Sequence, residues 1–180
     1  LSMLPPAPGP QVAVLTPAGG FGVMCADYVE VDQRGIPLTM ARLQPETVRR
    51  IREATFPFAA CENPVDLTAS ADDAMFGHSL DALLQDAGVD IIICTAFFAP
   101  PAISDGLIRE IADRVRTSSK PVITFTQYGP FTDLYLRRFH DAGVVGFASI
   151  SRAVRAARFL VERARILAAL LTLVDKDTDA

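Results

Sequence analysis

The stretch Thr16-Pro17-Ala18-Gly19-Gly20-Phe21-Gly22-Val23-Met24 directly follows the apolar run Val12-Ala13-Val14-Leu15. The apolar run is typical of a buried strand, and the residues after the glycines have helical spacing. A strand, a glycine-rich turn and a helix start leave backbone N–H groups free at a helix end that carries about half a positive charge. Glycines also let a ligand approach the backbone closely. The stretch therefore predicts a phosphate or anion site, formed by Gly19, Gly20, Phe21, Gly22 and Val23.

Length and charge limit the class of protein. The chain has 180 residues, half of them hydrophobic, which is enough to form the core of one domain. Its 21 acidic and 17 basic residues give a net charge of −4, which argues against nucleic-acid or membrane partners. The 3 cysteines lack a CxxC pair, so neither a disulfide framework nor a metal site is expected. We expect a soluble, cytoplasmic domain.

The ends of the chain differ in composition from its centre. The first ten residues are rich in proline, so we expect segment 1–10 to be a tether. We assign 11–174 to a single module and 175–180 to a tail. The apolar run 166–174 is too short to span a bilayer, but it extends an apolar helix face beyond what a small domain needs. We therefore consider a homodimer through this C-terminal helix, or packing of the helix on another domain.

Strand and helix patterns alternate along the rest of the chain. Apolar or extended runs predict strands at 12–15, 36–38, 64–67, 90–94, 121–125 and 144–147. Segments with apolar residues three and four apart lie between them, and a long final helix is expected from about 151 to 173. Gly88 and Gly143 stand where glycines end helices. The pattern predicts an α/β fold, a three-layer, doubly wound parallel sheet of the flavodoxin-like kind.

In such a sheet ligands bind beyond the carboxyl ends of the strands, so the loop that begins Asn63-Pro64-Val65-Asp66-Leu67-Thr68 is expected near the active site. We take Asn63, Pro64, Val65, Asp66 and Thr68 as its candidate residues. Asp66 could orient a catalytic group or bind a metal-linked phosphate. The interpretation we favour is that it hydrogen-bonds its own loop backbone, as Asx residues do.

Both segments resemble signatures of one family. The segment from Thr16 to Asp27 is similar to the T-N-A-G-G-x-G-V-x-A-A-D signature of NDP-forming acyl-CoA synthetases, and 63–68 is similar to their N-P-V-D-x-T signature. Lys120-Pro121-Val122 and the Ser151-Arg152 start of the last helix also resemble the family. The resemblance covers about 12–164 and implies the succinyl-CoA synthetase-like fold.

The resemblance implies that this chain is one module of an acid–thiol ligase. Such enzymes join a CoA-binding domain, a phosphohistidine domain and an ATP-grasp domain, and use CoA, ATP or ADP, and magnesium. The glycine-rich segment matches a helix whose N-terminus faces the phosphohistidine, so its implied role is to stabilise the phosphoryl group. By this resemblance the chain alone binds no cofactor.

This sequence also departs from the family pattern. Pro17 replaces the usual asparagine, Ala69 replaces a glycine, and the Ser-His-Thr-Gly segment of the phosphorylated histidine is absent. The only histidines, His78 and His140, lie on predicted helices without a positioning partner. We expect no catalytic residue in this chain and no activity from it alone. The alternative is a stand-alone flavodoxin-like protein that binds a phosphorylated small ligand or nucleotide.

Overall fold

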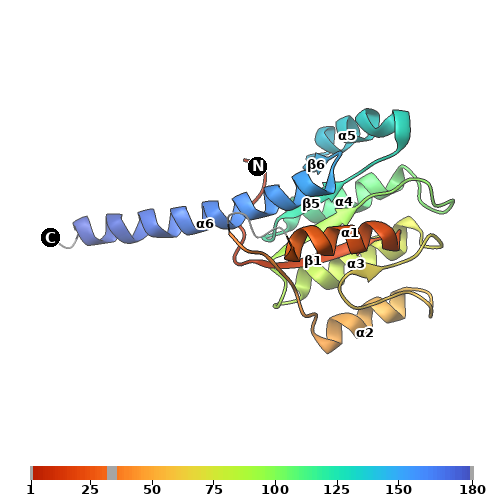
Figure 1. Ribbon diagram of the computed structural model, residues 1–180, viewed down its shortest axis with the longest axis horizontal. Coiled ribbons are helices and arrows are strands. Elements are labelled where there is room, and N and C mark those ends of the chain that lie inside the picture. The colour runs from red at the N-terminus through yellow and green to blue at the C-terminus, as the bar shows by residue number, and fades with distance from the viewer. Residues whose placement is uncertain (1, 32–35, 179–180) are drawn as a thin grey trace.

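The protein forms one parallel sheet with helices on both faces (Figure 1). The structure is a computed structural model that describes residues 2–31 and 36–178, with side chains described as far as Leu171. The strands are β1 (Gln11–Thr16), β2 (Thr39–Met40), β3 (Val65–Asp66), β4 (Ile91–Thr95), β5 (Val122–Phe125) and β6 (Gly146–Phe147). Within the described residues they form a 6-stranded sheet, and every pair is parallel.

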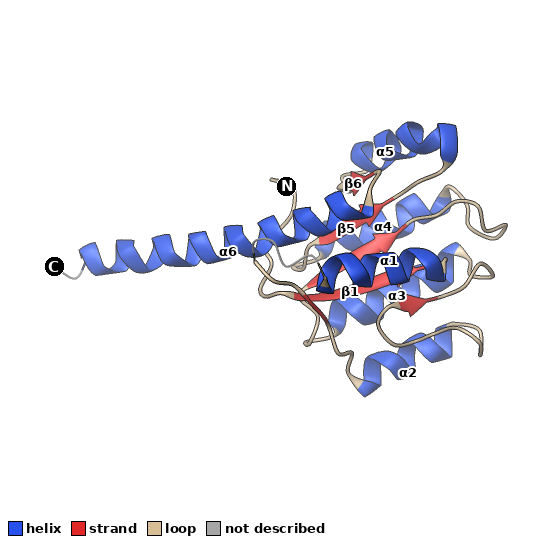
Figure 2. Cartoon of the chain, in the orientation of Figure 1, coloured by secondary structure: helices blue, strands red, loops and turns tan. Residues whose placement is uncertain are grey.

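In the part of the chain that the structure describes, two helices cover one face of the sheet and four cover the other (Figure 2). The first layer holds α1 (Gly19–Glu30) and α6 (Ile150–Thr178). The second holds α2 (Pro45–Ala54), α3 (Asp73–Gln85), α4 (Gly106–Thr117) and α5 (Thr132–Asp141), with a short 3₁₀ turn at Gly129–Phe131. This three-layer arrangement confirms the fold class predicted from the alternating pattern.

The strand order is β2-β1-β4-β5-β6, and β3 also pairs with β1. If β3 is left aside, this is the flavodoxin-like order, in which the chain first moves to one edge and then returns past the first strand. Strands β2 and β3 share the outer side of β1: Gln11 pairs with Thr39 in β2, and Leu15 pairs with Val65 in β3. On this side, β1 therefore pairs with β2 over its first residues and with β3 over its last residues.

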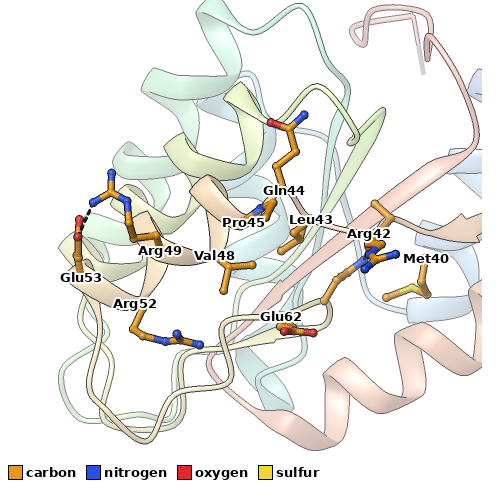
Figure 3. A pocket seen from close by; sticks show the side chains of 12 residues that line it. Met40, Arg42, Leu43, Gln44, Pro45, Val48, Arg49, Arg52, Glu53 and Glu62 are labelled. Carbon is orange, nitrogen blue, oxygen red and sulfur yellow. Dashed lines mark hydrogen bonds and ion pairs between the residues drawn. The ribbon is translucent and has the colours of Figure 1, made fainter.

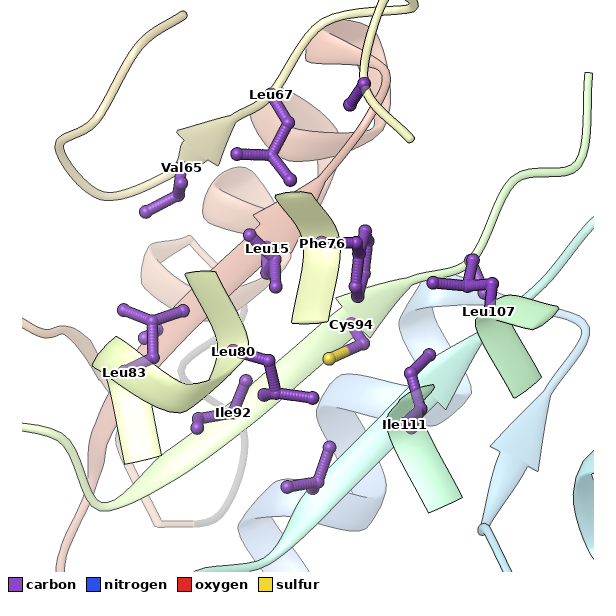
Figure 4. Packing of buried hydrophobic residues seen from close by; sticks show 14 of the residues in the cluster. Leu15, Val65, Leu67, Phe76, Leu80, Leu83, Ile92, Cys94, Leu107 and Ile111 are labelled. Atoms are coloured by element: carbon purple, nitrogen blue, oxygen red, sulfur yellow. The ribbon is translucent and has the colours of Figure 1, made fainter. Parts of the chain in front are cut away.

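Alternate residues of the strands pack into the two layers. Val12 and Val14 face α1 and α6, whereas Ala13 and Leu15 belong to the larger core on the other face, and all four are fully buried. Figure 4 shows that larger core, where Phe76 and Leu80 of α3 pack on the sheet. Each such large side chain contributes about 1.5–3 kcal/mol through burial.

Two sequence-based expectations about element ends need correction. The second strand lies at Thr39–Met40 rather than 36–38, because Pro37 has no N–H to donate and the first bond comes from Thr39, which donates to the carbonyl of Pro10 directly before β1. Gly88 does not end α3 in a left-handed conformation. The helix stops at Asp86 instead, whose carboxylate accepts from the Gly88 N–H at 2.8 Å. Gly143 does end α5, with a φ of 81°.

The described ends of the chain lie against or beyond this body. Leu4 and Ala7 are buried in the core beside α6, so the described part of segment 1–10 packs on the domain. Helix α6 begins on the sheet and then projects away from it (Figure 1). None of the described helices has the length and apolar character needed to cross a membrane. The division into 1–10, 11–174 and 175–180 stays a prediction.

Candidate functional site

The turn after β1 is held by the hydroxyl of Thr16. This buried hydroxyl donates to the carbonyl of Ala18 at 2.9 Å and accepts from the Ala18 N–H at 3.0 Å. It also accepts a hydrogen bond from the Thr95 hydroxyl at the end of β4. These bonds tie the start of α1 to the carboxyl ends of two neighbouring strands, where α/β folds bind ligands.

Helix α1 begins at Gly19 with an uncapped N-terminus. Its N-cap, Ala18, has no side chain that could accept a hydrogen bond, and the first turn holds no acidic residue. The N–H groups of Phe21 and Gly22 bond to the Ala18 carbonyl at 3.0 and 3.4 Å. Among the described residues, no protein group accepts a hydrogen bond from the N–H of Gly19 or Gly20. Two donors and the positive helix end are thus available to an anion.

The three glycines of this turn serve different purposes. Gly20 is exposed, and a Cβ added there would meet nothing within 4 Å. Gly22 is buried, and its Cβ would lie 3.1 Å from Cγ2 of Thr16 and 3.3 Å from Cβ of Pro64. Gly20 therefore leaves space at the surface, while Gly22 lets α1 approach the strand and the second loop.

The other predicted anion-site residues point in different directions. The ring of Phe21 packs edge-on against Phe97 at 5.3 Å and Phe125 at 5.2 Å, which anchors the helix start to the loops after β4 and β5. Val23 is 61% exposed. Neither side chain offers a polar group, so an anion here would be bound by the backbone rather than by side chains.

Asp66 brings the second loop to the same helix start. Its Oδ2 lies 2.5 Å from the place where a Cβ at position 19 would be, so any other residue there would force the carboxylate of Asp66 to move. Its Oδ1 accepts from the Thr68 N–H at 2.9 Å. This bond accompanies a positive φ of 66° at Thr68, a conformation that a β-branched residue rarely adopts. The favoured interpretation of Asp66, a bond to its own loop backbone, is therefore confirmed.

The Asn63 side chain bridges β1 and Ala41, the residue that follows β2. Its Oδ1 accepts from the Val14 N–H at 2.9 Å, and its Nδ2 donates to the carbonyls of Val12 at 2.8 Å and Ala41 at 3.0 Å. The amide thus supplies hydrogen bonds at the point where β1 changes its partner from β2 to β3. Val65, two residues on, is fully buried. Within this motif, Asn63 and Val65 have structural roles.

A buried arginine at the far end of α1 was not anticipated. Nη2 of Arg158, in α6, donates to the carbonyls of Tyr28 at 2.9 Å and Val29 at 3.4 Å. A cation at a helix C-terminus compensates its negative end. In the sequence, Arg158 is one of several arginines of the same helix. Only its place on the buried face of α6 distinguishes it from the exposed ones.

A groove opens at the sheet edge between β2 and α2 (Figure 3). Its volume is about 1000 Å³, and its charged lining includes Arg42, Arg52 and Glu62. Arg49 also lines it, but its guanidinium is paired with Glu46 and Glu53. Asn63 lines this groove, whereas none of Gly19 to Val23 does. The groove and the helix start are therefore separate features.

Comparison with known proteins identifies the family to which this geometry belongs. Residues 12–164 match the Ligase-CoA domain. This chain is a member of the Ligase-CoA domain family. The match includes both signature segments, and it confirms the resemblance to NDP-forming acyl-CoA synthetases.

Several named relatives share this Ligase-CoA domain. The chain is 32% identical over 163 residues to the alpha subunit of ADP-forming acetate–CoA ligase II from Pyrococcus furiosus, covering 87% of this chain and 34% of that protein. It is 34% identical over 158 residues to ADP-forming acetate–CoA ligase I from Archaeoglobus fulgidus, covering 88% of this chain and 22% of that protein. The chain thus spans about a third or less of the curated relatives it matches.

Solved structures share the same Ligase-CoA fold. The crystal structure of PH0766 from Pyrococcus horikoshii OT3 superposes with a TM-score of 0.80 at 30% identity, covering 91% of this chain and 38% of that one. The dinucleotide forming acetyl-coenzyme A synthetase 1 of Ca. Korarchaeum cryptofilum, in complex with phosphate and ADP, gives a TM-score of 0.79 over 91% of this chain and 35% of that one. At 24% identity the second likeness shows the fold alone.

The histidines of this Ligase-CoA domain lie on helices other than α1, and its three cysteines are buried. His78 and His140 are exposed on α3 and α5, and the nearest carboxylate to His140 is that of Asp141, at 3.7 Å. Cys25 is buried, and burial raises the pKa of its thiol to about 12, so the helix end does not activate it. Within the described residues no group of three or more His, Cys, Asp and Glu could hold a metal ion.

Proposed function

We propose that this Ligase-CoA domain is a module of an NDP-forming acyl-CoA synthetase. In this proposal the N-terminus of α1 stabilises a phosphoryl group carried by a histidine of a partner domain. The observation that carries it is the uncapped helix start, where the N–H groups of Gly19 and Gly20 have no acceptor among the described residues. The names of the relatives, ADP-forming acetate–CoA ligases, supply the chemical context.

The helix start suits a phosphoryl group because its donors are fixed in advance. Thr16 holds the turn from one side, and Phe21 holds it from the other through its contacts with Phe97 and Phe125. Backbone donors that are already oriented need no rearrangement as negative charge arrives. Hydrogen bonds to charged groups contribute about 1.5–3 kcal/mol each, more than neutral ones do. The exposed Gly20 leaves the approach open.

The remaining chemistry belongs, in this proposal, to partner domains. A CoA-binding domain, a phosphohistidine domain and an ATP-grasp domain would supply the binding sites for CoA, for ATP or ADP with magnesium, and the nucleophilic histidine. Neither histidine of this chain lies on a loop at the helix start, and neither has the oriented partner that a nucleophile requires. The chain contributes a binding surface to the phosphoryl group, and no residue that forms or breaks a bond.

The test is to incubate the purified chain with radiolabelled ATP, magnesium, CoA and acetate. We expect no acid-labile phosphate on the chain and no acyl-CoA. Addition of proteins that carry the CoA-binding, phosphohistidine and ATP-grasp domains should give turnover that depends on this chain. Stoichiometric labelling of the chain alone, lost in His78→Ala or His140→Ala, would contradict the proposal and make the protein a self-contained phosphotransfer protein.

A further inference from the structure

The groove between β2 and α2 has the size of a small-molecule site (Figure 3). Three stretches of the chain form its walls: residues 40–45 at the end of β2, one face of α2, and residues 62–63. Its volume of about 1000 Å³ is at the upper end of the range for ligand pockets, about 300–1000 Å³. The groove therefore has room for an organic molecule rather than for a single ion.

Part of the groove lining is apolar. The side chains of Met40, Leu43 and Val48 line it, and all three residues are half-buried. Leu43 and Val48 also pack against the larger core, which fixes their positions. This part of the lining would shield the less polar portion of a bound molecule from water.

Two arginines in the groove carry charges without a protein partner. Among the described residues, no group forms an ion pair or a hydrogen bond with the side chain of Arg42 or Arg52. Arg49, on the same helix as Arg52, is instead paired with both Glu46 and Glu53. The groove therefore presents two guanidinium groups that remain available to an anion.

Glu62 adds a hydrogen-bond acceptor from the third wall. In the view of Figure 3 it lies between Arg52 and Arg42, yet within the described part of the chain it forms no ion pair with either. Inorganic phosphate would attract the arginines but would be repelled by Glu62. A molecule that carries both an anion and hydroxyl groups can satisfy all three side chains.

We propose that the groove binds a phosphate monoester whose organic part carries hydroxyl groups, as nucleotides and sugar phosphates do. Arg42 and Arg52 bind the phosphate, because each guanidinium matches phosphate oxygens with parallel N–H donors and a dianion matches the charge of two arginines. Glu62 accepts hydrogen bonds from the hydroxyls. None of Gly19 to Val23 lines the groove, so this site is separate from the helix start.

The test is titration of the isotope-labelled chain with AMP at low salt, followed by NMR. We expect saturable shifts of backbone amides within 40–53 and 62–63. Adenosine, which lacks the phosphate, should bind at least about tenfold more weakly, since it loses the charge-assisted hydrogen bonds. Ribose 5-phosphate, which lacks the base, distinguishes the two sources: equal affinity would identify the ligand as a sugar phosphate, and tighter binding of AMP would identify it as a nucleotide.

Variants of the two arginines test the phosphate contacts. Arg42→Gln and Arg52→Gln should each raise the dissociation constant for AMP by about tenfold. Both residues are exposed, so the variants should fold normally, which circular dichroism checks. Arg50→Gln is the matched control on α2, because Arg50 bonds to Gln85 and does not line the groove. It should leave AMP binding unchanged.

Two further variants locate the ligand. Glu62→Ala should lower the preference for AMP over inorganic phosphate several-fold, because it removes an acceptor for hydroxyls together with a charge that repels phosphate. Gly20→Asp changes the start of α1 and should leave binding in the groove unaltered. The groove is thereby tested independently of the role proposed for that helix.

Three results would overturn the proposal. The first is the absence of saturable shifts at the groove with either phosphate ester. The second is adenosine binding as tightly as AMP, or AMP binding that neither arginine variant weakens. The third is AMP binding that is lost in Gly20→Asp but retained in Arg42→Gln and Arg52→Gln, which would place the ligand at the start of α1 instead.

Discussion

Gly19 and Asp66 meet at the start of α1: Oδ2 of Asp66 lies 2.5 Å from the position that a Cβ of residue 19 would take. The two signature segments, far apart in the sequence, are thus in direct contact at the candidate site. The contact also places the negative carboxylate of Asp66 beside the N–H groups of Gly19 and Gly20. We propose that these same N–H groups bind a negatively charged phosphoryl group. Glycine at position 19 therefore lets the carboxylate of Asp66 approach the helix start, and we expect its charge to weaken the attraction of the helix end for free anions.

The first prediction tests this competition. Asp66→Asn keeps an oxygen that can accept from the Thr68 N–H, but it removes the negative charge. Inorganic phosphate should bind the isolated chain more tightly, by on the order of 1 kcal/mol or about fivefold, because a repulsive charge at the protein surface is lost. Titration calorimetry or NMR at low salt measures the change.

Asp27→Asn is the matched control, since Asp27 is exposed on the same helix but lies two turns from its start. It changes the net charge equally and should leave phosphate binding unaltered. Weaker phosphate binding in Asp66→Asn would show that the carboxylate assists the anion instead of opposing it.

The second prediction is that substitutions at Gly20 and Gly22 affect stability differently. Gly22→Val should lower the free energy of unfolding by about 1–3 kcal/mol, because the new side chain would meet Thr16 and Pro64. Gly20→Ala should leave stability unchanged or raise it by up to about 1 kcal/mol, since alanine favours helix. Urea denaturation followed by circular dichroism measures both. Equal losses would contradict the packing described at Gly22.

The third prediction concerns Asn63. Asn63→Ala should lower the free energy of unfolding by about 2–4 kcal/mol, since it leaves three backbone groups of β1 and residue 41 without partners. Asn63→Asp can still accept from the Val14 N–H but turns an oxygen toward the carbonyls of Val12 and Ala41. It should therefore be about as damaging as alanine. A fully stable aspartate variant, measured by urea denaturation at pH 7, would refute the bridging role.

The fourth prediction follows from the buried thiols. Burial raises the pKa of Cys25 from 9.0 to about 12, and burial also raises that of Cys94. The unfolded chain therefore loses these protons at lower pH than the folded chain does. Their contribution to stability is complete below pH 9 and should be lost as the pH rises from 9 toward 12.

The measurement is urea denaturation of the wild type and of Cys25→Ala at pH 8, 10 and 11. The difference in unfolding free energy between the two proteins should shrink as the pH rises. The native thiol should also resist iodoacetamide at pH 8 and react once the chain is unfolded. Rapid modification of native Cys25 would contradict its burial.

The sequence predicts the alternating layers well, because each buried strand forms a continuous apolar run such as Val12–Leu15 and each helix repeats its apolar residues every three or four positions. Short edge strands are less predictable. Strand β2 has only two residues, and its place depends on which backbone groups reach β1 rather than on hydrophobicity.

Of the candidate site, the uncapped helix start could be inferred from its glycines, since their role is local. The contact of Asp66 with Gly19 and the bridge made by Asn63 depend on how distant segments pack. The capping of α1 by Arg158 likewise joins residues that no spacing rule connects. Hydrophobic periodicity predicts which face of a helix or strand is buried. It does not predict which polar groups of distant segments form hydrogen bonds with each other.

We propose that the start of α1 acts through its positive charge on a phosphoryl group. Gly20→Asp tests it most directly, because residue 20 is exposed and a Cβ added there would meet nothing within 4 Å. An acidic residue in the first helical turn should preserve or slightly raise stability, by about 0.3–1 kcal/mol. The same charge should repel the phosphoryl group. With partner domains added, we predict at least about a hundredfold loss of acyl-CoA formation for Gly20→Asp. The Gly20→Ala control should lose far less, and both variants should remain folded. Normal turnover by a folded Gly20→Asp enzyme would contradict the account, because a helix end that tolerates a negative charge there does not bind the phosphoryl group.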